Sequence, residues 1–312
     1  MKMKLDVVIM ATKKNLKTLK KSIPYIKNNI KHDAIYIVSS KKNQTEITDI
    51  KDVTFVDEDS VVSGMTFAAV ADIMEELTGS RSRTGWYFQQ FLKLGWAQHA
   101  TGKYYVVIDA DTFPLNQIDF ISEHERYEFT SKIEYNKPYF DTIDQLFHGR
   151  YKRVGDFSFV AEHMAFDVSI VKQMLEEIER SNPQKGNSFY EIILRSVNTA
   201  DLPIAGFSEF ETYGTYISAN YPELVQMRKL RTLREAAYVL GGEPTKEQLE
   251  WAAQDYDIIS IEVPEYSDKI FTRMTRNSFV QKHIHLSTIA KTRQNLRSVY
   301  RKMVGKKDMR FD

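Results

Sequence analysis

The sequence predicts an α/β protein with a mixed sheet flanked by helices. Short apolar, β-branched runs alternate with segments of helical spacing through the first hundred residues, which is typical of strands joined by crossover helices. The apolar runs lack polar alternation, which suits strands covered on both faces. With 312 residues, of which 42% are hydrophobic and 12% aromatic, the chain can bury a substantial core.

The predicted elements follow one another at short intervals. Strands are expected at 5–12, 34–40, 53–59 and 104–108, with a further strand within 156–167. Helices are expected at 15–30, 61–77, 86–100, 168–181 and 189–201. Residues 78–85 are expected to form a loop, and residues 206–218, which are aromatic, acidic and punctuated by glycine, a wall of a cleft.

Charge and cysteine content exclude some classes of protein. Lys and Arg number 43 against 42 Asp and Glu, and this balance gives no basic excess for a nucleic-acid partner. The absence of cysteine excludes disulfides and thiolate metal sites and suits a reducing cytoplasm. The apolar run at 5–12 is too short for a signal-peptide core and contains Asp6. No run approaches the roughly 20 apolar residues of a membrane helix, so we expect a cytoplasmic protein, at most peripheral at the inner face of the membrane.

The run "YYVVIDADTFPL" at 104–115 ends its strand with two aspartates, Asp109 and Asp111. Two carboxylates one residue apart repel each other and are costly to bury without a partner, and a divalent cation resolves both problems. Mg²⁺ and Mn²⁺ prefer carboxylate oxygens and keep positions open for phosphate or water. A solvated turn is the alternative, because aspartate is common where a strand ends.

Other polar and small residues follow the remaining predicted strands. Ligands of α/β sheets bind beyond the carboxyl ends of the strands. The candidates for nucleotide contacts there are Ala11, Thr12, Ser39 and Asp57.

A basic loop precedes the helix predicted at 86–100. Arg81 and Arg83 lie where a helix N-terminus and guanidinium groups would favour phosphate, although a solvated loop explains them equally well. Lys93, on that helix, could also reach a phosphate.

Four segments together resemble bacterial glycosyltransferases of the GT-A type. They are "GWYFQQFLKL", "YYVVIDADTFPL", "SFVAEHMAFD" and "GFSEFETYGTY", and the resemblance covers most of residues 5–220. The most similar branch is associated with capsule and lipopolysaccharide biosynthesis. The resemblance implies one catalytic domain at 1–225, with a nucleotide-binding half at 1–115 and an acceptor half at 116–225. Residues 226–312 would then form a helical region with a basic tail.

The resemblance also implies roles for the motif residues. A nucleotide-sugar donor, most commonly a UDP-sugar, would bind through Mn²⁺ or Mg²⁺, with Asp111 as the leading ligand and Asp109 supporting the ribose or the metal. Many relatives take a further ligand from a late histidine, and "QKHIHLS" offers His283 and His285.

An inverting transfer to a glycan or lipid-linked acceptor needs a general base. We favour Glu209 or Glu211, and expect Glu162 and His163 to contact the donor or acceptor sugar, with Glu162 as a further candidate base. A retaining enzyme would need no such base.

The basic C-terminal stretch could be a membrane-surface helix. Ile289, Leu296, Val299 and Met303 could form an apolar stripe among lysines and arginines. A solvated terminal helix is the alternative interpretation.

Three other functions compete with glycosyl transfer. A phosphatase of the haloacid dehalogenase type also places D-x-D after a strand, but Phe113 stands here where its D-x-D-x-T pattern has threonine. A nucleotidyltransferase would normally carry a glycine-rich loop after the first strand, whereas "MATKKNLKT" has none. An inactive scaffold would not need the intact aspartates.

Overall fold

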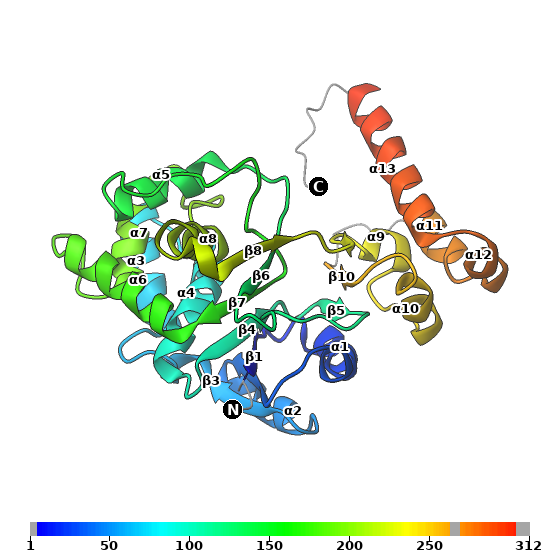
Figure 1. Cartoon of the computed structure of the whole chain (residues 1–312), viewed down its shortest axis with the longest axis horizontal. Helices are drawn as coiled ribbons and strands as arrows, with labels where there is room; N and C mark the ends of the chain where they lie inside the picture. The colour runs from blue at the N-terminus through cyan, green and yellow to red at the C-terminus, as the bar shows by residue number, and fades with distance from the viewer. Residues whose placement is uncertain (1–4, 263–268, 304–312) are drawn as a thin grey trace. The chain divides into compact units, whose positions relative to one another are not determined.

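The computed structural model describes residues 5–262 and 269–303, which fall into two compact units (Figure 1). The first unit takes the chain up to Lys13, His32–Ile108 and Phe120–Arg228, and the second takes Lys14–Lys31, Asp109–Asp119 and the chain from Lys229 onward. The last change of unit lies close to the boundary expected at 225. The two earlier segments join the second unit because they pair and pack with C-terminal elements.

A five-stranded mixed sheet forms the centre of the first unit and confirms the predicted fold class. Its strands are β1 (Leu5–Met10), β2 (Ala34–Ser39), β3 (Thr54–Asp57), β4 (Tyr104–Ile108) and β7 (His163–Asp167). They lie in the order β3-β2-β1-β4-β7, and all neighbours are parallel except β7, which runs antiparallel to β4. All five residues of β4 are buried, as expected for a strand covered on both faces.

Helices pack beside this sheet (Figure 1). They are α2 (Gln44–Thr48), α3 (Phe67–Thr78), α4 (Thr84–His99), α5 (Lys137–Leu146), α6 (Val168–Ser181), α7 (Phe189–Ser196) and α8 (Glu209–Asn220). Helix α4 is buried along most of its length and packs against α3, α6 and α8. A small parallel pair of strands, β6 (Tyr127–Thr130) and β8 (Val225–Arg228), completes the unit.

Three helices differ from the sequence-based expectation. Helix α7 ends at Ser196 rather than at 201, because the backbone of Val197 is extended (φ −72°, ψ 136°). Helix α3 begins at Phe67 rather than 61, because Gly64 has a φ of 81° and the Thr66 side chain caps the helix by accepting from the Ala69 amide at 3.1 Å. Residues 206–218 were expected to form a cleft wall, but α8 occupies most of them, starting after the Ser208 N-cap. Phe159 covers Gly214 so closely that a Cβ there would lie 2.2 Å from the ring.

The second unit has its own sheet and core. Helix α1 (Leu16–Asn29) packs against β5 (Thr112–Pro114), which pairs antiparallel with β10 (Ile258–Ser260), and β10 pairs with β9 (Thr232–Leu233). The remaining helices are α9 (Ala237–Leu240), α10 (Lys246–Ala252), α11 (Lys269–Met274), α12 (Ser278–His283) and α13 (Leu286–Met303). Phe113 is fully buried in this core, edge-on to Tyr25 at 5.7 Å. Among the described residues, no helix has both the length and the apolar content that crossing a membrane requires.

Candidate functional site

The register of β4 and β7 places two predicted sugar contacts at one edge of the first unit's sheet. Ile108, the last residue of β4, lies opposite His163, the first residue of β7. Because β7 is antiparallel, Glu162 and His163 therefore lie at the edge where the parallel strands end. This is the edge at which α/β sheets bind ligands.

Residues at the ends of β1, β2 and β3 lie side by side at the same edge. Ser39 is the register partner of Asp57, and its hydroxyl donates to the Ala11 carbonyl at 2.7 Å while accepting from Asn43 at 3.0 Å. The Ser39 side chain is buried and ties β1 to β2, whereas Thr12 is exposed. In the structure, the Ser39 hydroxyl thus holds the ends of β1 and β2 together. Its contact with a nucleotide stays a prediction.

Glu58 follows Asp57 and was not singled out from the sequence. Burial, together with the negative charges of Asp59 and Asp57, raises its pKa to about 7. Three adjacent acids give a sequence signal, but only the partial burial of Glu58 together with its two acidic neighbours raises its pKa.

Glu162 and His163 are both buried and have different partners. Lys132 forms an ion pair with Glu162 at 3.5 Å, and Thr130 bonds to His163 Nε2 at 2.9 Å. Burial, and then the positive charges of Arg228 and Lys132, hold the pKa of His163 well below its usual range. The imidazole is therefore neutral near pH 7, and it is suited to hydrogen bonding and not to charge attraction.

Two residues predicted for different roles, Lys93 and Glu209, are partners of each other. Lys93 Nζ lies 2.8 Å from Glu209 Oε1, both side chains are buried, and the ammonium sits 4.5 Å from the centre of the Phe210 ring. Removing one partner of such a pair leaves a buried charge without a counter-ion, which typically lowers stability by about 3–5 kcal/mol. The pair joins α4 to the first turn of α8, a positioning function that sequence reading did not foresee.

Glu211, the other predicted base, is buried in the first turn of α8. Its Oε2 accepts from the Ser158 hydroxyl at 2.5 Å and from the Phe159 amide at 3.2 Å. Burial raises its pKa, and these two hydrogen bonds and the charge of Arg153 partly offset the increase. A carboxylate with a raised pKa and one oxygen held in place has the properties of a general base.

The two loop arginines have local contacts. Arg81 pairs with Asp72 at 2.7 Å and Glu75 at 2.8 Å on the surface. Arg83 is exposed at the start of α4, has a φ of 67°, and stacks over Trp86 at 4.5 Å. The predicted contact of Arg83 with a phosphate stays a prediction.

The D-x-D aspartates directly follow β4 in the chain and belong to the second unit. Their backbones are fixed, since the Asp109 carbonyl accepts from the Thr112 amide at 3.0 Å and the Asp111 carbonyl accepts from the Ile261 amide at 2.9 Å. Ala110 between them is buried, while both aspartates are partly exposed. Two accessible carboxylates are a donor set of the kind that Mg²⁺ or Mn²⁺ takes together with the phosphates of a substrate.

The late histidines lie elsewhere in the second unit. His285 bonds to Asp255 at 2.8 Å, and His283 bonds to the Phe279 carbonyl at 2.8 Å and stacks on the Phe279 ring at 4.2 Å. In the part of the chain that the structure describes, no three His, Asp or Glu side chains are grouped to hold a metal. The described residues therefore do not assemble the four-residue set of Asp109, Asp111, His283 and His285, and a metal held by the aspartates would take its other ligands from substrate and water.

Comparisons with known proteins name no activity for this chain. A family model described as "Family of unknown function (DUF6492)" matches residues 11–132, which include α4 and the D-x-D motif. No curated protein matches the sequence. The crystal structure of mouse xyloside xylosyltransferase 1 in its apo form is similar, with a TM-score of 0.41 and 13% identity over 83% of this chain and 96% of that one. A likeness of this size carries no part of the functional proposal.

The neutral state of His163 predicts a pH dependence of stability. The unfolded imidazole binds a proton near its ordinary pKa of 6.5, whereas the folded one resists it, so stability is retained above that pH and lost as the pH falls through it. Between pH 7 and pH 5 this residue should cost about 2 kcal/mol of unfolding free energy.

Urea unfolding of His163→Gln at the two pH values checks this expectation. The variant should lose less stability on acidification than the wild type, while His124→Gln, which removes an exposed histidine of the same unit, should behave like the wild type. Identical pH dependence in His163→Gln and the wild type would contradict the assignment.

Proposed function

We propose that this protein is a metal-dependent glycosyltransferase that moves a sugar from a nucleotide-sugar, with a UDP-sugar as the first candidate, to a glycan or lipid-linked acceptor. The observation that carries the proposal is the Asp109–Asp111 pair directly after β4, a strand paired on both edges within a mixed sheet. The four segments that resemble GT-A enzymes support it. Assembly of a bacterial surface polysaccharide is the pathway that the resemblance suggests.

The proposed role of the aspartates is to hold the donor's diphosphate through a divalent cation. Asp111 is the leading ligand, and Asp109 supports it or contacts the ribose. When bound, Mn²⁺ or Mg²⁺ would neutralise charge on the departing nucleoside diphosphate. The backbone hydrogen bonds of both residues fix the main chain there, while the partly exposed carboxylates stay accessible to a cation.

For an inverting transfer, we propose Glu211 as the general base in preference to Glu209. Glu209 is the counter-ion of Lys93 at 2.8 Å, and protonation during catalysis would leave that buried ammonium without its charge partner. Glu211 receives only neutral donors, from Ser158 and Phe159, on Oε2. Burial already moves its pKa toward the working pH, so taking a proton is less costly there.

Calorimetric titration with UDP, GDP, ADP, CDP and dTDP tests the role of the aspartates. At least one nucleotide should bind wild type with Mn²⁺, and binding should weaken by about 100-fold in Asp111→Asn or on chelation, because a charge-bridged diphosphate loses its metal. Asp119→Asn changes an exposed aspartate of the same unit, which pairs with Lys31, and should leave binding unchanged. Metal-independent binding, or binding that Asp111→Asn does not alter, would refute the role.

We further propose that helices α11 to α13 hold the enzyme at an anionic membrane surface. Residues 269–303 contain nine Lys and Arg and no Asp or Glu; the nine are Lys269, Arg273, Arg276, Lys282, Lys291, Arg293, Arg297, Arg301 and Lys302. Each basic residue near an anionic surface contributes about 1 kcal/mol of attraction. The basic residues that would attract an anionic membrane thus lie on α11 and α12 as well as on the terminal helix α13.

The predicted apolar stripe is only partly available to a membrane. Ile289 is buried in the second unit's core, so the stripe begins later on α13, at Leu296 (57% exposed), Val299 and Met303. Phe279 on α12 (67% exposed) adds a large apolar side chain. Arg293 and Arg297 lie over Tyr238, at 3.8 and 5.4 Å from its ring, and are held to their own unit.

Vesicle flotation with the full chain tests this surface. Wild type should float with phosphatidylglycerol-containing vesicles and much less with pure phosphatidylcholine. Replacing Phe279 and Leu296 together by Asp should abolish flotation, since it puts charge on both apolar contacts. Ile133→Asp alters a more exposed apolar residue of the other unit, at 81%, and should float as wild type does. Equal flotation of all three proteins would remove the membrane proposal.

A further inference from the structure

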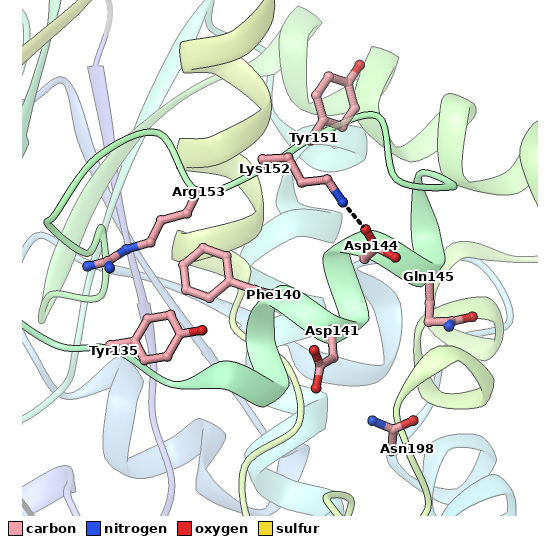
Figure 2. A pocket seen from close by; sticks show the side chains of 9 residues that line it. All are labelled: Tyr135, Phe140, Asp141, Asp144, Gln145, Tyr151, Lys152, Arg153 and Asn198. Atoms are coloured by element: carbon pink, nitrogen blue, oxygen red, sulfur yellow. Dashed lines mark hydrogen bonds and ion pairs between the residues drawn. The ribbon is translucent and has the colours of Figure 1, made fainter.

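A groove of about 710 Å³ opens in the first unit (Figure 2). Helix α5 supplies Phe140, Asp141, Asp144 and Gln145 to it. The segments on either side of the helix and Asn198, after α7, supply the rest of the lining. One continuous stretch, residues 135–153, and the more distant Asn198 therefore converge on one open site.

An aromatic pair, the exposed Tyr135 and the half-buried Phe140, forms one wall of the groove. The rings of Tyr135 and Phe140 stack at 5.4 Å with an interplanar angle of 16°, and the Arg153 guanidinium lies over Tyr135 at 4.9 Å. Tyr135 is 59% exposed although it carries a large ring. Leaving that much apolar area in water is unfavourable, so an aromatic face held open in a concavity indicates a ligand that covers it.

The charges of the groove are balanced internally. Lys152 pairs with Asp144, Lys137 bonds both oxygens of Asp141 at 2.6 Å, and Arg153 lies 3.8 Å from Asp156. A phosphate or nucleotide would have to compete with these carboxylates for the cations. The preferred ligand is therefore uncharged and rich in hydrogen-bonding groups.

The polar side chains suit hydroxyl groups in particular. Asp141 and Asp144 offer carboxylate acceptors, while Gln145 and Asn198 each offer an amide donor and an amide acceptor. Figure 2 shows Asp141 and Asn198 on the side of the groove away from Arg153. A pyranose ring has this double character, because its C–H face stacks on aromatic rings and its hydroxyls point outward.

The groove is built on fixed parts. Tyr151 at its base is buried, its ring packs on Tyr216 at 5.2 Å, and its hydroxyl receives a bond from Asn220 at 3.1 Å. Thr142 anchors α5 by donating to the Gly206 carbonyl at 2.7 Å. Since these contacts exist without ligand, binding would cost little conformational entropy.

We infer that this groove binds a neutral oligosaccharide, with a sugar ring stacked on the Tyr135–Phe140 pair. Binding requires neither donor nucleotide nor metal. The groove's affinity for sugar does not depend on the proposed function. Only the further claim that the bound glycan is the acceptor of the transfer rests on the proposed function.

Calorimetric titrations with maltohexaose, cellohexaose, xylohexaose and chitohexaose test the inference. EDTA is present in these titrations and nucleotide is absent. At least one probe should bind wild type with a Kd below about 10 mM. Tyr135→Ala and Phe140→Ala should each weaken it by about tenfold, the effect of losing one stacking face. Tyr135→Phe keeps the ring and should stay within about threefold. Phe67→Ala, which removes an exposed aromatic of the same unit outside the groove, should bind as wild type does.

Two results would overturn the inference: wild type that binds none of the four probes, or Tyr135→Ala and Phe140→Ala that bind as tightly as wild type. Asp111→Asn should retain glycan binding in full. A protein that binds glycan but no nucleotide would support the glycan-binding groove and contradict the proposed transferase function. The failure of one proposal can therefore be distinguished from the failure of the other.

Discussion

Strand β4 is hydrogen-bonded on both edges, to β1 in parallel and to β7 in antiparallel orientation, and much of the molecule depends on that double pairing. A strand with both edges satisfied and every residue buried cannot continue into carboxylates, because burying two unpaired charges would cost several kcal/mol. The chain must leave the sheet at Asp109. The antiparallel β7 then brings its first residue, His163, to the same edge, which places a neutral imidazole opposite Ile108.

Two buried ion pairs of the first unit have positioning functions. Lys93 and Glu209 join α4 to α8, and Lys132 and Glu162 join the β6 region to the start of β7. Pairs of this kind seldom add net stability relative to apolar residues, but removing one member is strongly destabilising. Glu211 differs because its partners are a hydroxyl and an amide. Neighbouring glutamates on one helix turn thus differ: Glu209 holds a structural ion pair, and Glu211 is the residue that we propose for proton transfer.

Sequence reasoning predicted what is local and missed what is long-range. The first four strands, the buried helix before β4 and the D-x-D position follow from apolar runs and their ends. The membership of Asp109–Asp119 in the second unit depends on β5 pairing with β10, about 145 residues away, which no local pattern indicates. Helix α8 was missed because its buried face covers nearly the whole helix, leaving no amphipathic period. Lys132 and the Tyr135 groove lie in a stretch without periodicity, and only folding brings their partners together.

Turnover of a nucleotide-sugar tests the central claim most directly. Purified protein incubated with Mn²⁺ and UDP-glucose, UDP-galactose, UDP-N-acetylglucosamine, UDP-xylose or GDP-mannose should release the nucleoside diphosphate from at least one donor, slowly by hydrolysis and faster with an acceptor glycan. Asp111→Asn should reduce the rate by about 100-fold or more, because the leaving group would lose its metal. Release of inorganic phosphate from p-nitrophenyl phosphate without turnover of any donor would contradict the account, as would an Asp111→Asn variant as active as wild type.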